Sequence, residues 1–198
     1  EALEILARRA GLDLTKLMKD RPRVLRAAPL EALTPSPGLA TDGNGRDAVP
    51  PSPPAARPSE VLARVVDHYH KTFCARADAQ EYLKKRGLTD PDILRAFKVG
   101  YADGSLLKLL PKEGEVRDQL LSLGVVTPEK RELLGGCIVV PIPDPLSGEW
   151  TTLYGRGLRT PRHCYLPGPL RGVLNFQAAK ASEEVILAES ILDALSFH

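Results

Sequence analysis

The sequence lacks several features that mark particular classes of protein. Its apolar runs fall well short of the roughly 18 residues that a membrane-spanning helix needs, and nothing in it resembles a signal peptide. It has only three cysteines (Cys74, Cys137 and Cys164), far apart and without a Cys-x-x-Cys pair. Because the cysteines are few and odd in number, they argue against a disulfide framework and favour a reducing compartment. We therefore expect a cytoplasmic protein without a membrane partner.

A large excess of charge of one sign is also absent, because 27 basic and 25 acidic side chains leave a net charge of +2. The distribution is more informative than the total. Residues 151–180 carry five basic and no acidic side chains, and residues 181–198 carry four acidic side chains and no Lys or Arg. A basic surface beside an acidic cluster suits a protein that handles phosphates near metal ions. A solvated basic loop followed by a solvated acidic turn explains the same pattern equally well.

Proline is concentrated in one part of the chain. Residues 22–58 hold nine of the eighteen prolines, together with several glycines and hardly any large apolar residue after Leu39. Such a composition buries too little surface to offset the entropy of ordering, so it predicts a flexible linker. We accordingly divide the chain into a tail helix of an upstream domain (1–21), the linker (22–58), a main subdomain (59–181) and the start of another domain (182–198).

The main subdomain changes character along its length, from helical spacing to β-type patterns. Apolar spacing and stop signals predict helices over 59–74 with Ser59 as N-cap, over 78–86, from Asp90-Pro91 onward, over 106–110, over 116–123 and over 175–181. Strands are expected at 99–101, 136–143, 149–154 and 164–166, the middle two as a hairpin. We therefore predict an α+β fold in which helices accompany an antiparallel sheet.

The last stretch of the sequence has the pattern of a buried strand followed by a helix. Val185–Ala188 is wholly apolar, as is typical of a strand buried on both faces, and Glu189 stands where that strand should end. Ser190 can then cap a helix that begins at Ile191. An acid at the carboxyl end of a core strand lies at the rim where α/β sheets bind ligands.

Taken in order, these segments resemble the polymerase core of bacterial-type DNA primases. The series runs through Tyr82-Leu83 with Arg86-Gly87-Leu88, Phe97–Tyr101, Val140–Asp144, Gly155-Arg156, Tyr165-Leu166 and Glu189-x-x-x-Asp193. The resemblance implies an amino-terminal subdomain with a basic groove, followed by the first β-α unit of an α/β Toprim domain. It also implies a nucleotidyltransferase that makes short RNA primers on single-stranded DNA from ribonucleotides. Mg²⁺ or Mn²⁺ at Toprim acids, Zn²⁺ in an upstream domain and a replicative helicase as partner belong to the same expectation.

The resemblance assigns roles to two acids. Glu189 matches the glutamate at the end of the first Toprim strand, where a carboxylate serves as an acid/base or metal-site residue in phosphoryl transfer. Asp193 matches a further acid of the family and is the weaker candidate for metal binding. Its position three residues after Ser190 has the spacing of a capping box, which would give Asp193 a structural role instead.

The resemblance also assigns a role to Arg156, which matches an arginine of the basic groove that contacts template or nucleotide phosphate. The planar guanidinium suits this task because it donates two hydrogen bonds at once. The alternative is a surface arginine in a Gly-x-Gly turn. Where the family usually has a lysine, the sequence has Cys164. The weaker candidates for nucleic-acid or nucleotide binding are Arg159, Arg162 and Arg171.

Two other functions remain open. The first is a non-catalytic single-stranded DNA-binding module of a plasmid or mobile-element replication protein, which would keep the basic groove without the chemistry. An Asp-x-Asp motif on the strand after Glu189 would distinguish the enzyme from this module. The second is another Toprim enzyme, such as a nuclease or topoisomerase, but the motifs before Val185 match the primase subdomain and argue against it.

The 198-residue chain alone should not synthesise primers, because the Asp-x-Asp metal motif that the family places on the next strand is not within it. Incubation with Mg²⁺, ribonucleotides and a single-stranded template, followed by a denaturing gel, should show no RNA product. Primers made by the isolated chain would contradict this expectation.

Overall fold

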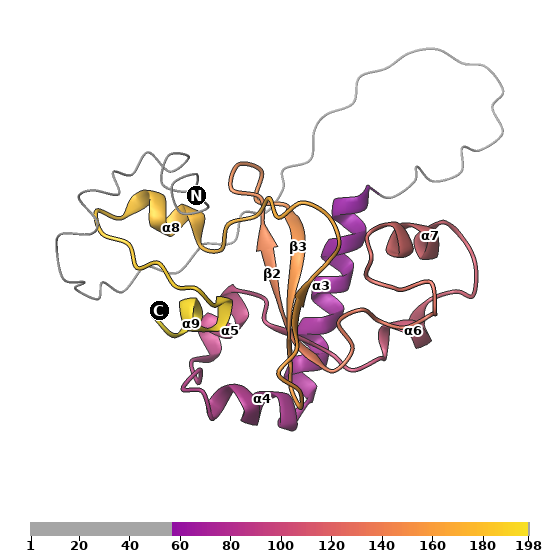
Figure 1. Cartoon of the computed structure of the whole chain (residues 1–198), viewed down its shortest axis with the longest axis horizontal. Helices are drawn as coiled ribbons and strands as arrows, with labels where there is room; N and C mark the ends of the chain where they lie inside the picture. Colours follow the sequence, from indigo (N-terminus) through magenta and orange to yellow (C-terminus); the bar gives the residue numbers. More distant parts are fainter. Residues whose placement is uncertain (1–56, 198) are drawn as a thin grey trace, which may run out of the picture.

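The long helix α3 (Pro58–Ala75) lies along one face of an antiparallel sheet and begins the part of the chain that the structure describes (Figure 1). The computed structural model describes residues 57–197, so the predicted tail helix and nearly all of the predicted linker lie outside the described residues. The expectation that Ser59 caps this helix is wrong. Pro58 occupies the first helical turn, where its fixed φ is favourable, and Arg57 is the N-cap. The Glu60 carboxylate accepts a hydrogen bond of 3.3 Å from the Arg57 backbone N–H.

Within residues 57–197 the sheet has four strands in the order β1-β2-β3-β4, and all neighbours are antiparallel. A tight turn joins the two central strands, in which the Asp144 carboxylate accepts 2.9 Å hydrogen bonds from the backbone N–H groups of Leu146 and Ser147. The predicted hairpin and α+β class are therefore confirmed. The strands are β1 (Gly100–Ala102), β2 (Cys137–Pro143), β3 (Trp150–Gly157) and β4 (His163–Tyr165).

Strand β2 is buried on both faces and separates two apolar clusters. Cys137 and Val139 point to one side and pack with α3, and we call this side the α3 face. Ile138 and Val140 point to the other side, the α4 face, and pack with Leu83 of α4. Side chains of α6 (Leu106–Leu109) and α7 (Glu115–Ser122) join the cluster of the α3 face. The α4 face is covered by α4 (Ala77–Lys84), α5 (Pro91–Ala96) and α9 (Ile191–Ser196), which Figure 1 shows away from α6 and α7.

Several predicted helix ends are confirmed by their caps. Gly87 follows α4 with φ +79°, the left-handed conformation that favours glycine. The Asp90 side chain accepts a 2.8 Å hydrogen bond from the Asp92 backbone N–H and caps α5. The Ser190 hydroxyl caps α9 by accepting a 3.4 Å hydrogen bond from the Asp193 backbone N–H. The helix predicted over 175–181 is α8 (Phe176–Ala181).

Gly100 allows α3 to approach β1 closely. A Cβ atom at this position would lie 2.7 Å from the Cβ of Tyr69 and 2.9 Å from its carbonyl carbon. These distances are too short for any side chain, and backbone atoms cannot move aside easily. The glycine of the Val99–Tyr101 motif is therefore required by the packing of α3 on the sheet.

The predicted strand Val185–Ala188 is wrong. The structure has no regular secondary structure there, and Ile186 and Leu187 are 36% and 55% exposed. An apolar run forms a strand only where a neighbouring strand accepts its backbone hydrogen bonds, and within residues 57–197 none lies beside it. The following helix is nevertheless anchored, because Leu192 and Leu195 of α9 are buried in the cluster of the α4 face.

One acid is buried in the α3 face. Glu132, 7% exposed, forms an isolated β-bridge with Val126. Burial raises the pKa of the Glu132 carboxyl above its ordinary value, although the Tyr69 hydroxyl and the backbone N–H groups of Leu107 and Leu106 oppose the rise. Burial likewise raises the pKa of Tyr69 well above its ordinary range.

Replacing Glu132 with Gln should remove a pH dependence of stability. The folded state keeps the proton of this carboxyl to a higher pH than the unfolded chain, so the free energy of unfolding falls as pH rises from about 4.5 through the raised pKa. Urea unfolding of the variant from about pH 4, near the ordinary pKa of a glutamate, up to about pH 8 should lack this fall. Glu129→Gln is the matched control, because Glu129 is exposed in the same loop. A fall as large in Glu132→Gln as in the parent would contradict the assignment.

Candidate nucleic-acid interface

Arg156 lies in a row of side chains that crosses the whole sheet. The strand register places Tyr101 opposite Ile138, Ile138 opposite Arg156, and Arg156 opposite His163. Residues directly opposite each other in antiparallel strands point to the same face. Because Ile138 belongs to the cluster of the α4 face, Arg156 also points to that face, close to its centre.

The surroundings of Arg156 are aromatic. The nearby Tyr82 hydroxyl is the largest cause that raises the pKa of Arg156, and the Tyr154 hydroxyl contributes in the same direction. The Nε atom of Arg156 is buried without a hydrogen-bond partner, and no carboxylate within residues 57–197 forms an ion pair with this arginine. Its nearest polar neighbours are neutral hydroxyls, which leave its positive charge uncompensated. The site can therefore accept an anion.

Two further contacts extend the aromatic surroundings. The Cζ atom of Arg86 lies 4.9 Å from the centre of the Tyr82 ring, a cation–π distance. The rings of Tyr154 and Tyr165 lie 5.2 Å apart and are tilted by 56°. The sequence singled out Tyr82 and Arg86 as motif residues without giving them a role. Their spacing of four, which brings two side chains together on a helix, was the signal available, although Arg86 lies two residues past the end of α4 (Ala77–Lys84).

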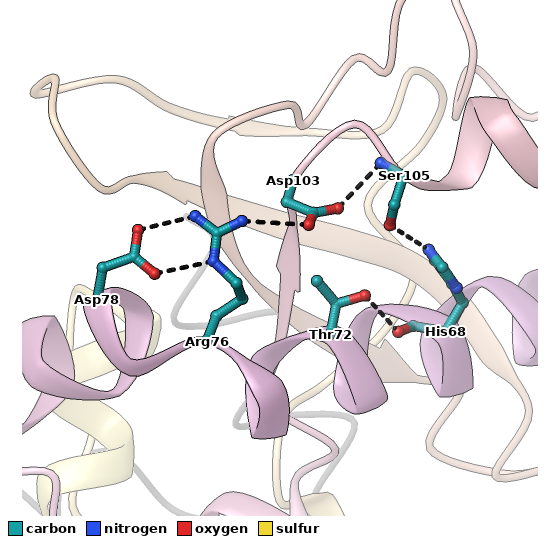
Figure 2. Close-up of polar contacts among 6 residues, drawn as sticks. All are labelled: His68, Thr72, Arg76, Asp78, Asp103 and Ser105. Atoms are coloured by element: carbon teal, nitrogen blue, oxygen red, sulfur yellow. Dashed lines mark hydrogen bonds and ion pairs between the residues drawn. The ribbon is translucent and has the colours of Figure 1, made fainter.

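A second arginine on this face, Arg76, has its charge compensated (Figure 2). It lies between α3 and α4 and donates to both oxygens of Asp78 at 3.0 Å and to Asp103 at 3.3 Å. The hydrogen bond from Arg76 lowers the pKa of Asp78. The Asp103 carboxylate also accepts a 2.9 Å hydrogen bond from the Ser105 backbone N–H. The Ser105 hydroxyl in turn lies 2.9 Å from Nε2 of His68, within hydrogen-bonding distance. This network joins α3, α4 and the turn after β1, so Arg76 has a structural role.

The other predicted arginines are spread over the molecule. Arg159 is exposed and shares a hollow with Arg76 and Tyr101 at the end of β3, on the side of Arg156. Arg162 donates a 2.7 Å hydrogen bond to the Leu133 carbonyl and lies near Cys137 of the α3 face.

Arg171 lies near the turn between β2 and β3. The pKa of Asp144 is lowered mainly by the backbone N–H groups of Ser147 and Leu146, and Arg171 adds to the same effect. The structure therefore brings Arg159 to the same side as Arg156, and it places Arg162 on the other face and Arg171 at the turn. Cys164, at the place of the family's lysine, pairs with Gly155 in the sheet and lies near Cys137.

The two predicted acids lie at the start of α9. Glu189 and Asp193 are both exposed. The Asp193 backbone N–H donates to the capping hydroxyl of Ser190, and its carbonyl accepts a 2.7 Å hydrogen bond from the Ser196 hydroxyl. Within residues 57–197, no three His, Cys, Asp or Glu side chains are close enough to hold a metal ion together. The acids of residues 57–197 thus do not form a metal site by themselves.

An uncompensated arginine among aromatic rings on a sheet face is typical of proteins that bind nucleic-acid strands. No protein-family model matches the sequence. The chain is 36% identical over 90 residues to the DNA primase of Aquifex aeolicus strain VF5 and 28% identical over 117 residues to that of Haemophilus influenzae. The matches cover 43% and 56% of this chain but 18% and 19% of the primases. The chain thus spans about a fifth of the length of the curated relatives it matches.

Solved structures agree with the sequence comparison. The crystal structure of the Aquifex aeolicus primase, with zinc-binding and RNA polymerase domains, is 32% identical with a TM-score of 0.50. The match covers 58% of this chain and 30% of that chain. The DnaG catalytic core is 22% identical with a TM-score of 0.52, over 58% of this chain and 39% of that chain, and shows the fold alone. The predicted relationship is confirmed: the chain is related to bacterial-type DNA primases.

Proposed function

We propose that this chain forms the template-binding part of a DNA primase, a DNA-directed RNA polymerase that makes short RNA primers on single-stranded DNA for replication. The observation that carries the proposal is the uncompensated guanidinium of Arg156, which lies on a sheet face among tyrosines. The relatives named DNA primase support it. A DnaG primase catalytic domain bound to single-stranded DNA has a similar fold and also supports it. That domain is 24% identical with a TM-score of 0.50, and the match covers 57% of this chain and 39% of that chain.

In this proposal Arg156 binds a backbone phosphate of the template. Its planar fork can donate two hydrogen bonds to the phosphate oxygens. The flanking tyrosines fix the side chain before the strand arrives, which lowers the entropy lost on binding. Arg159 lies on the same side and would contact the strand where it leaves the end of β3.

Glu189 is the proposed catalytic carboxylate, acting as a general acid or base, or as a metal-site residue, in phosphoryl transfer. It precedes α9, whose buried Leu192 and Leu195 fix the position of that helix against the template-binding face. The remaining components are proposed for the complete protein: ribonucleotides, Mg²⁺ or Mn²⁺ with Asp193 as a weaker ligand, Zn²⁺ in an upstream domain, and a replicative helicase. No helix within residues 57–197 is long and apolar enough to cross a membrane, and we propose a cytoplasmic location.

A non-catalytic single-stranded DNA-binding module remains a second candidate. The Arg156 site does not involve Glu189, so strand binding by this face requires no catalytic acid. Primer synthesis by the full-length protein and by its Glu189→Gln variant separates the two functions. The primase proposal expects RNA primers from the parent and none from the variant, with unchanged DNA binding. A parent that binds DNA but makes no primers would favour the binding module.

Replacing Arg156 with Ala should weaken binding to a single-stranded oligonucleotide and reduce the slope of log affinity against log salt by about 1. The reason is that one phosphate contact and its released counterion are lost. Fluorescence anisotropy over a series of NaCl concentrations measures both quantities. Arg95→Ala is the matched control, because Arg95 on α5 is exposed and paired with Asp92 at 2.9 Å.

Binding by Arg156→Ala that matches the parent at every salt concentration would remove Arg156 from the interface. A thermal melt of each variant shows whether a change in affinity comes from unfolding. Arg156→Lys keeps the charge but loses the fork, and it should bind with intermediate affinity.

A further inference from the structure

We propose that His70 and Cys74, near the end of α3, form an open binding site for a borderline-soft divalent cation such as Zn²⁺. The imidazole Nε2 atom and the thiolate Sγ atom are the two protein ligands, and water fills the remaining positions of a tetrahedral shell. The inference does not depend on the proposed function, because it uses neither Arg156 nor Glu189.

The first argument is the distance between the two donor atoms. His70 and Cys74 are four residues apart on a helix, a spacing that brings side chains together, and Sγ of Cys74 lies 3.9 Å from Nε2 of His70. In a tetrahedral site with Zn–S of about 2.3 Å and Zn–N of about 2.0–2.1 Å, these two atoms are roughly 3.6 Å apart. The two donors therefore need to move by only a few tenths of an ångström to share one ion.

The second argument is the hydrogen bonding of the His70 ring. Its Nδ1 atom lies 2.7 Å from the Val99 carbonyl oxygen. Because a carbonyl only accepts, Nδ1 carries the proton, and in the neutral ring the lone pair is on Nε2, next to Cys74. A ring N–H donated to a carbonyl is the arrangement that orients metal-binding histidines. His68, on the same helix, differs in that its Nε2 lies 2.9 Å from the Ser105 hydroxyl.

The third argument is that both donors lie on a fixed but accessible part of the molecule. Cys74 is exposed and His70 is half-buried, whereas Phe73 between them is buried and anchors the helix in the cluster of the α4 face. The Cys74 carbonyl accepts a 2.9 Å hydrogen bond from the Gln80 side chain, which fixes the last turn. The C-terminal end of a helix favours a cation, and the last turn of α3 has no basic side chain.

The other cysteines suit a metal ion less well. Cys137 and Cys164 lie near each other on the α3 face, but Cys137 is buried. Burial raises the pKa of the Cys137 thiol, which disfavours the thiolate that a metal ion requires. This second pair of thiols is nevertheless the alternative that an experiment has to separate from His70 and Cys74.

The test titrates the reduced, chelator-stripped 198-residue chain with Co²⁺, because cobalt–thiolate bonds give a near-ultraviolet charge-transfer absorption. Calorimetry with Zn²⁺ in two buffers of different ionisation enthalpy then measures affinity, stoichiometry and proton release. The cation replaces the hydrogen of the Cys74 thiol, and the proton passes to the buffer. We expect the absorption, one ion per chain and one proton released per ion.

The variants assign the ligands. Cys74→Ser should abolish the absorption, and His70→Gln should weaken Zn²⁺ binding by about tenfold or more. His68→Gln is the matched control on the same helix and Cys164→Ser the control for the other thiols; both should bind as the parent does. Thermal melts show whether each variant folds, and since Cys74 is exposed, Cys74→Ser keeps the inference testable if His70→Gln does not fold.

Three results would overturn the inference. Absorption that persists in Cys74→Ser, or that is lost in Cys164→Ser, would assign the ion to the other thiols. One ion per two chains would indicate a site shared between copies in place of an open one. A parent chain without saturable binding has no such site. None of these results affects strand binding by Arg156, which its own variants test.

Discussion

The burial of β2 on both faces is the constraint on which the rest of the structure depends. Its side chains alternate between the two apolar clusters, so helices must cover both sides of the sheet. The α3 face is filled largely by α3 itself, and Gly100 allows that helix to touch β1. The α4 face is covered by shorter helices, which leave part of the next strand, β3, accessible, and Arg156 lies there. The candidate interface is thus a consequence of how the sheet is covered.

Much of the fold could be predicted from local signals. The β2–β3 hairpin follows from two β-type runs around the turn at Asp144, and the caps at Asp90, Gly87 and Ser190 follow from residue types whose preferences are local. The strand predicted at Val185–Ala188 shows the limit of such signals. An apolar run indicates burial, but only a partner strand makes a β-strand, and partners are a property of the fold.

The candidate site was less predictable than the fold. Arg156 could be found by its resemblance to a known motif, but grouping it with Arg159, Arg162 and Arg171 assumed that neighbours in sequence share a surface. Arg162 precedes β4 and lies on the other face, where it donates to the Leu133 carbonyl near Cys137. The residues that do meet Arg156 come from elsewhere. Tyr82 lies far from it in the chain and reaches it only because α4 folds back over the sheet.

The central claim is that single-stranded nucleic acid binds the α4 face through arginines that lack carboxylate partners within residues 57–197. The most direct measurement is a nuclear magnetic resonance titration of the ¹⁵N-labelled chain with an oligothymidylate, following the Nε–Hε signals of the arginine side chains. The account predicts a saturable shift for Arg156, with Arg95 and Arg162 unaffected. Shifts confined to Arg162, or no shift at Arg156 while DNA is bound, would contradict it.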